Sequence, residues 1–226
     1  MIRLFLIVVS ALAVVLALMP APGIAEDYID PHWYESPIHF SAGFKFGLAF
    51  PAGDEMQDVY GTKGIPFYSI EAAWKMVHEL ELHAEMSYWW EQGRGVAEGG
   101  KKTNEKYKIH IAPAELGLIY RFNFVNDQIV VPYIGGGGIY SYYMEERLES
   151  SWKRRGGKWG VAGKAGLMLL LDNAEKKASG ALEREWKINN TYLIYSFKYS
   201  YLNNFDEKAG LDLSNQMHTL GVLFEF

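Results

Sequence analysis

Hydrophobic and polar residues alternate along most of the chain after residue 37. In residues 38–50, large apolar side chains such as Phe44 and Phe46 occupy every second position, and the positions between them hold Ser41, Gly43 and Lys45. Successive side chains of a β-strand point to opposite faces, so this pattern predicts a strand with one apolar and one small or polar face. The same reasoning predicts eight strands, at roughly residues 38–50, 67–77, 80–90, 107–122, 129–144, 158–171, 190–202 and 213–226.

The segment at residues 129–144 is the strand whose two faces cannot be assigned by alternation. It contains four consecutive glycines, Gly135 to Gly138, between apolar residues. Glycine inside a strand often marks a close approach of two backbones or a sharp bend in a curved sheet. We therefore expect one of these features here and leave the facing of this strand open.

An even number of strands favours an all-β, antiparallel, up-and-down barrel, because closure removes both edges of the sheet. A water-soluble barrel would show water a polar outer face, whereas the second face here is rich in Gly, Ala and Ser, which suit a crowded interior. The bulky apolar face then points outward into lipid, and each strand is long enough to cross a membrane. Aromatic clusters near strand ends predict interfacial girdles, at Tyr88–Trp90, Tyr140–Tyr143 and Tyr199–Tyr201.

The first 25 residues have the order of a secretory signal peptide. Arg3 precedes an apolar run that ends at Met19, and Gly23 to Ala25 supply the small residues of a cleavage site. We expect residues 1–25 to be a signal peptide, residues 26–37 a periplasmic segment and residues 38–226 the barrel domain. The absence of Cys from the 226 residues excludes disulfides and Cys-based metal sites, and the net charge of −5 argues against nucleic acid as a partner.

The lengths of the connections predict which end of the barrel faces outward. Membrane barrels alternate long outer loops with short inner turns. The segments 51–66, 91–106, 145–157 and 203–212 are long and are predicted to be exterior, whereas 78–79 and 123–128 are short. The connection at 172–189 is too long for a tight turn, and the sequence does not determine its conformation.

The last strand carries a signature of membrane insertion. Val222, Phe224 and the terminal Phe226 lie on its apolar face. With the alternating strands, the signal peptide, the Pro132 to Gly138 segment and the Tyr192 to Tyr199 segment, this end resembles the small Gram-negative outer-membrane β-barrels that include the OmpA transmembrane domain and OmpX. The resemblance covers residues 38–226. It implies insertion by the barrel-assembly machinery and contact with outer-membrane lipids and lipopolysaccharide.

Pointing the apolar face outward directs ten charged side chains into the lumen. A lone buried charge costs several kcal/mol, so cations and anions are expected to pair there. A structural salt-bridge plug and a gated narrow pore both fit this pattern. The predicted inward polar network comprises Lys45, Glu71, Lys75, Glu81, Glu85, Glu115, Arg121, Lys164, Lys198 and Glu225.

The predicted function is a non-enzymatic outer-membrane barrel with a structural or surface-interaction role and no cofactor or metal. A channel for small solutes or small apolar molecules is one alternative. A lipid A-modifying enzyme is another, because His39 and Ser41 share a face of the first strand and faintly resemble the His-x-Ser-Asn of barrel deacylases, although Ala42 stands where Asn is needed. Lys101–Lys102 and Lys153–Arg155, in exterior loops, are candidate contacts for lipopolysaccharide phosphates. The sequence does not identify a ligand, conductance or an oligomeric state.

Overall fold

The computed structural model of the protein describes residues 39–96, 101–124, 128–171, 187–205 and 211–226. Within them lie one short helix and eight strands. Alternation of apolar and polar residues produces the strands, and Gly61, with a φ of 91°, ends the helix in a conformation that favours glycine. The elements are β1 (Phe40–Pro51), α2 (Asp54–Tyr60), β2 (Ile65–Lys75), β3 (Leu80–Val96), β4 (Lys102–Arg121), β5 (Val130–Arg147), β6 (Lys153–Leu170), β7 (Asn190–Tyr201) and β8 (Asn215–Glu225).

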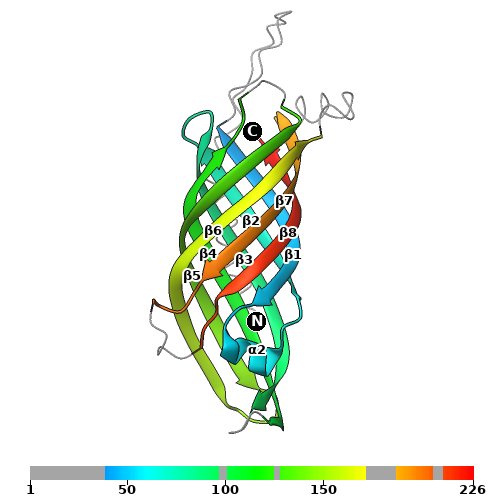
Figure 1. Ribbon diagram of the computed structural model, residues 1–226, viewed down its shortest axis with the longest axis vertical. Coiled ribbons are helices and arrows are strands. Elements are labelled where there is room, and N and C mark those ends of the chain that lie inside the picture. The colour runs from blue at the N-terminus through cyan, green and yellow to red at the C-terminus, as the bar shows by residue number, and fades with distance from the viewer. Residues whose placement is uncertain (1–38, 97–100, 125–127, 172–186, 206–210) are drawn as a thin grey trace, which may run out of the picture.

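The strands form one closed antiparallel barrel in sequence order (Figure 1), which confirms the predicted fold. β8 closes the barrel by pairing with β1, where Phe44 lies opposite Val222. We call the end where β1 joins β2 and β3 joins β4 the loop end, and the opposite end, where Phe226 pairs with Phe40, the terminal end. α2, the one helix in the described residues, is not long and apolar enough to cross a membrane.

Large apolar side chains cover the outside of the barrel wall. Phe46 is 55% exposed on β1 and Leu116 is 61% exposed on β4. The side chains at most of the alternate positions of the strands point into the lumen and are buried there. Burial of this surface in lipid is favourable by about 25 cal/mol per Å² of apolar area. The outer face is therefore suited to hydrocarbon. Val222, Phe224 and Phe226 lie on this outward side, partly covered by their neighbours.

The glycine run of β5 lies where two strands approach closely. Gly137 is paired with Gly117 of β4. A Cβ atom added to Gly137 would lie 2.1 Å from the carbonyl oxygen of Leu116, well inside van der Waals contact. On either side of the run, Val131, Tyr133 and Ile139 point inward, so the structure decides the facing that the sequence left open.

The loop end differs from the prediction in three ways. β3 to β6 continue further than expected and project beyond the other four strands (Figure 1), so most of the predicted loop at 91–106 is strand. The segment 51–66 contains α2. Trp89 and Tyr143, predicted in the aromatic girdles, are 2% and 5% exposed and point into the lumen, because each lies on the inward face of its strand.

Some predictions fall on residues outside the described ranges. They include the signal peptide at 1–25 and the periplasmic segment at 26–37. Residues 172–186 of the long connection between β6 and β7, and residues 125–127 of a predicted turn, lie outside them as well.

Candidate functional site

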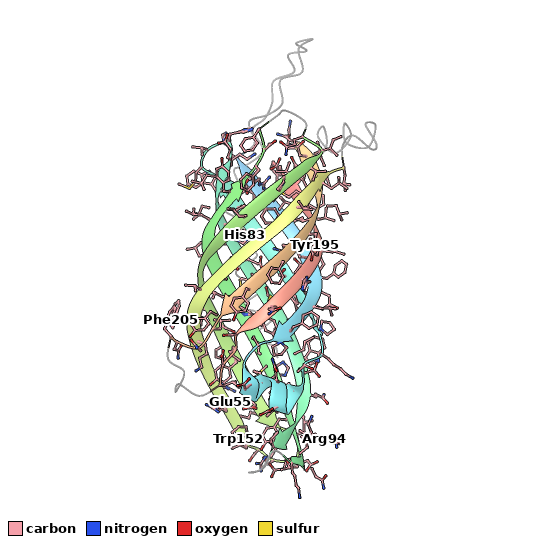
Figure 2. The ribbon with its side chains drawn as sticks, in the orientation of Figure 1. Glu55, His83, Arg94, Trp152, Tyr195 and Phe205 are labelled. Atoms are coloured by element: carbon pink, nitrogen blue, oxygen red, sulfur yellow. The ribbon has the colours of Figure 1, made fainter. Side chains whose placement is uncertain are left out.

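The centre of the lumen holds a cluster of buried ion pairs. The Lys45 ammonium donates to Glu71 at 2.8 Å and to Glu85 at 2.6 Å. His83 Nε2 lies 3.0 Å from Glu71, and Figure 2 places His83 in the half of the barrel nearer the terminal end. Lys45 lies on β1, Glu71 on β2, and His83 and Glu85 on β3, so these residues meet only when adjacent strands pair in register.

Lysines from the far wall complete this central cluster. Lys198 lies 2.5 Å from Glu85 and 3.2 Å from Glu115. Lys164 lies 3.0 Å from Glu85 and 2.8 Å from Glu115. Three lysines thus face three glutamates, and Glu85 contacts all three lysines. The cluster spans the lumen and carries no net formal charge when His83 is neutral.

A second group of ion pairs lies nearer the terminal end. Arg121 Nη2 lies 2.8 Å from Glu81, and its Nη1 donates to Glu225. Lys75 lies 3.6 Å from Glu225, and the Asn190 side chain donates to the same carboxylate at 2.9 Å. Two cations therefore face two anions. The structure places all ten residues of the predicted inward network in the lumen, divided into these two groups.

Toward the loop end, the lumen is apolar, which the sequence analysis missed. Met56 and Tyr60 of α2 turn inward and join a buried cluster with Trp89, Ile109 and Ile111. One feature of the sequence could have predicted this apolar cluster: in β4, the large apolar residue Leu116 occupies an even position but Ile109 and Ile111 occupy odd positions, which moves the apolar side chains from the outer to the inner face. α2 fits there because Gly93 of β3 has no side chain: a Cβ on Gly93 would lie 2.3 Å from the Val59 carbonyl oxygen.

The helix is also fixed by one polar contact. The Tyr60 hydroxyl donates to Glu145 of β5 at 2.7 Å. Burial raises the pKa of the Tyr60 phenol above its ordinary value, and the hydrogen bond to Glu145 adds a smaller rise. The phenol therefore stays neutral and keeps α2 across the mouth of the barrel.

Two small cavities lie in the described interior. One cavity lies beside the terminal group, between Glu81, Arg121 and Tyr133, and another lies under α2, between Met56, Trp89 and other residues. Each has space for about one water molecule. The described lumen is thus filled in succession by an apolar cluster, the central ion pairs and the terminal ion pairs.

Two other chemical readings find no assembled site in the described residues. Ligand atoms of Glu71, His83 and Glu85 lie within 4.8 Å of one another, but the Lys45 ammonium already bridges both carboxylates, which leaves no free cation site there. His39 is exposed before β1, whereas Ser41 is buried in the lumen. No hydrogen bond joins these two side chains in the structure, so the triad geometry of a hydrolase is not formed.

Comparisons with known proteins identify the fold. No protein-family model matches the sequence, and no curated protein matches it either. Among solved structures, the outer membrane protein OprG from Pseudomonas aeruginosa superimposes with a TM-score of 0.60 at 14% identity, over 84% of this chain and 96% of that chain. Neisserial surface protein A gives a TM-score of 0.48 at 13% identity, over 84% and 98% of the two chains.

The N-terminal β-barrel domain of Pseudomonas aeruginosa OprF gives a TM-score of 0.47 at 16% identity, over 84% of this chain and 99% of that chain. Sequence identities this low establish the architecture alone. The assignment of this architecture rests on the OprG superposition and on the closed barrel of the chain itself. The chain therefore has the fold of the small eight-stranded outer-membrane β-barrels of the OmpA/OmpX-like type.

Proposed function

We propose that the protein is an integral outer-membrane barrel with a closed lumen, and that it acts through its surface at the loop end rather than as an enzyme or an open channel. One observation carries this proposal: balanced ion pairs cross the lumen from wall to wall, with Glu85 contacting lysines of β1, β6 and β7. Opening a water path would separate these partners in a medium of low dielectric constant, where an unpaired charge costs several kcal/mol. The apolar outer wall and the signal-like N-terminus support the outer-membrane location.

Conductance in planar lipid bilayers tests the closed lumen. The folded protein, with insertion verified by its heat-dependent migration on gels, is expected to give no discrete current steps. The double variant Lys45→Ala/Glu85→Ala is also expected to stay closed, because the apolar cluster at the loop end still blocks the path. Current steps in the natural protein would refute a closed lumen, and steps confined to the variant would support a gate formed by the ion pairs.

The non-enzymatic part of the proposal has its own test. Lipid A from cells that express the protein is expected to have the same mass spectrum as lipid A from cells without it. A missing acyl chain that returns in the Ser41→Ala variant would refute the proposal and support the lipid A-modifying alternative.

A second candidate function is entry of small apolar molecules, favoured by the apolar cluster under α2. Its cavity is lined by Met56, Trp89 and Leu213 among other residues. Because the cavity has space for about one water molecule, the surrounding side chains must move apart to admit an alkane. If such molecules enter, a brominated alkane will quench the fluorescence of Trp89, and quenching will be smaller in the Trp89→Phe variant. Equal quenching in both proteins would contradict this candidate, because outward-facing tryptophans are reached from the lipid in either case.

A further inference from the structure

Positive charge collects on one outward face at the loop end. Leu118 and Leu116 of β4 point outward, and the register of β4 with β3 shifts only beyond Lys106, so Lys108 and Lys106 lie on the same outward face. Arg94 of β3 lies opposite Lys106 and shares this face with outward Trp90. In β6, Trp159 points outward, and the regular pairing with β5 places Arg155 and Lys153 on the same face. We call five residues the basic rim: Arg94, Lys106, Lys108, Lys153 and Arg155.

One anion on the same outward face, Glu146 of β5, lies opposite Lys108 and Lys153 and compensates the basic rim only in part. Lys153 is paired with Glu146 at 3.1 Å, but the other four cations have no ion-pair partner among the described residues. Arg94 lies directly opposite Lys106 in the pairing of β3 with β4. Like charges opposite each other on one face of a sheet destabilise it, so an anion from outside the chain would relieve this repulsion.

The opposite face of the same four-stranded extension is balanced. There Arg147 lies 2.8 Å from Glu105, and Arg154 lies opposite Glu145 in the pairing of β5 with β6. The excess of cations is therefore confined to the face that continues the lipid-facing wall. A ligand that fits it must approach from the side of the barrel.

The depth of the basic rim matches a layer of headgroups. Toward the tip of the loop end, the basic rim lies just beyond outward aromatic residues that include Trp90 and Trp159. Figure 2 places Arg94 near this tip. Aromatic girdles mark the boundary between hydrocarbon and headgroups. At the terminal end, the corresponding outward positions of the described strands hold apolar residues such as Trp74 and Leu169, and no Lys or Arg.

We propose that the basic rim binds the phosphate groups of lipopolysaccharide molecules that pack against β3 to β6. Arg155 and Arg94 can each bind a phosphate with two parallel N–H donors, and the lysines add point charges. A phosphorylated lipid is favoured over a soluble polyanion because the cations face sideways into the leaflet. This inference rests on the proposed outer-membrane location but not on the state of the lumen.

The test compares two variants that remove the same charge. The rim variant is Lys106→Gln/Arg155→Gln. The control is Lys63→Gln/Arg154→Gln, which changes the loop after α2 and the balanced face. The full chain, folded in a zwitterionic detergent, is titrated with purified lipopolysaccharide and with its enzymatically dephosphorylated form, and complexes are counted by native mass spectrometry. Unchanged heat-dependent migration verifies folding.

For the rim variant, we expect the apparent Kd for lipopolysaccharide to rise by at least about tenfold, because two charge-assisted phosphate contacts are lost. The control should change by less than about twofold, as is typical of exposed charges without a bound partner. Dephosphorylated lipopolysaccharide should bind the natural protein and the rim variant with equal, weaker affinity. Equal losses in both variants, no loss in either, or tight binding of the dephosphorylated form would each overturn the proposal. Conductance is measured separately, so failure here leaves the closed-lumen test intact.

Discussion

Glu85→Gln tests whether the central ion pairs are shielded from water, as their burial in the structure indicates. Glu85 accepts from Lys198 at 2.5 Å, from Lys45 at 2.6 Å and from Lys164 at 3.0 Å. Glutamine keeps one oxygen acceptor and turns an amide donor toward the lysines. The central cluster then has three lysines against two glutamates, Glu71 and Glu115. One buried cation is left without a balancing charge.

The magnitude follows from what is lost. Removal of one neutral hydrogen bond would cost about 0.5–1.5 kcal/mol, but an uncompensated charge at a buried ion pair costs about 3–5 kcal/mol. We expect the free energy of unfolding to fall by the larger amount. The assay is urea unfolding in phospholipid vesicles, followed by tryptophan fluorescence. Adding Lys198→Met to Glu85→Gln restores equal numbers of cations and anions and should recover at least about half of the loss.

A matched control separates burial from charge. Glu146→Gln breaks an ion pair with Lys153 of similar length, 3.1 Å, but those side chains are 25% and 51% exposed. Its expected cost is below about 1 kcal/mol. If Glu85→Gln costs no more than Glu146→Gln, water reaches the central cluster, and the reasoning for a closed lumen is wrong.

Three further predictions concern the wall, the glycine run and the helix. Leu116→Arg, on the lipid face, should lower the free energy of unfolding in vesicles by about 2–4 kcal/mol, and an unchanged urea midpoint would argue against lipid contact. Gly137→Val should cost at least about 1–3 kcal/mol, because its Cβ would lie 2.1 Å from the Leu116 carbonyl oxygen; a natural urea midpoint would contradict this close approach. Tyr60 has a raised pKa, so its neutral form stabilises the fold below the ordinary phenol value of 10.0, and this contribution is lost as the pH rises further. Tyr60→Phe should therefore show a smaller loss of stability between about pH 9 and pH 11 in the same urea assay, and an identical pH dependence would refute the assignment.

The alternating pattern by itself determined the class of fold. Side-chain direction along a strand depends only on position within that strand, so Phe44, Leu116 and Lys45 could be assigned to faces without knowledge of any partner. The excess of bulky residues on one face then selected a lipid-facing wall. The same local rule predicted that Lys45, Glu85 and Lys198 point inward, and the structure places them there.

Only the tertiary structure decided which groups meet. Glu85 contacts Lys164 and Lys198 across the lumen because closure of the barrel brings β3 opposite β6 and β7, and no local pattern encodes that distance. The facing of β5 was hidden because glycines carry no side chain whose polarity could report it. The apolar cluster under α2 could not be predicted, because a rule that places apolar residues toward lipid and polar residues in the lumen assigns Trp89 and Ile111 to the outer face. Their burial depends on a helix that folds back into the mouth of the barrel.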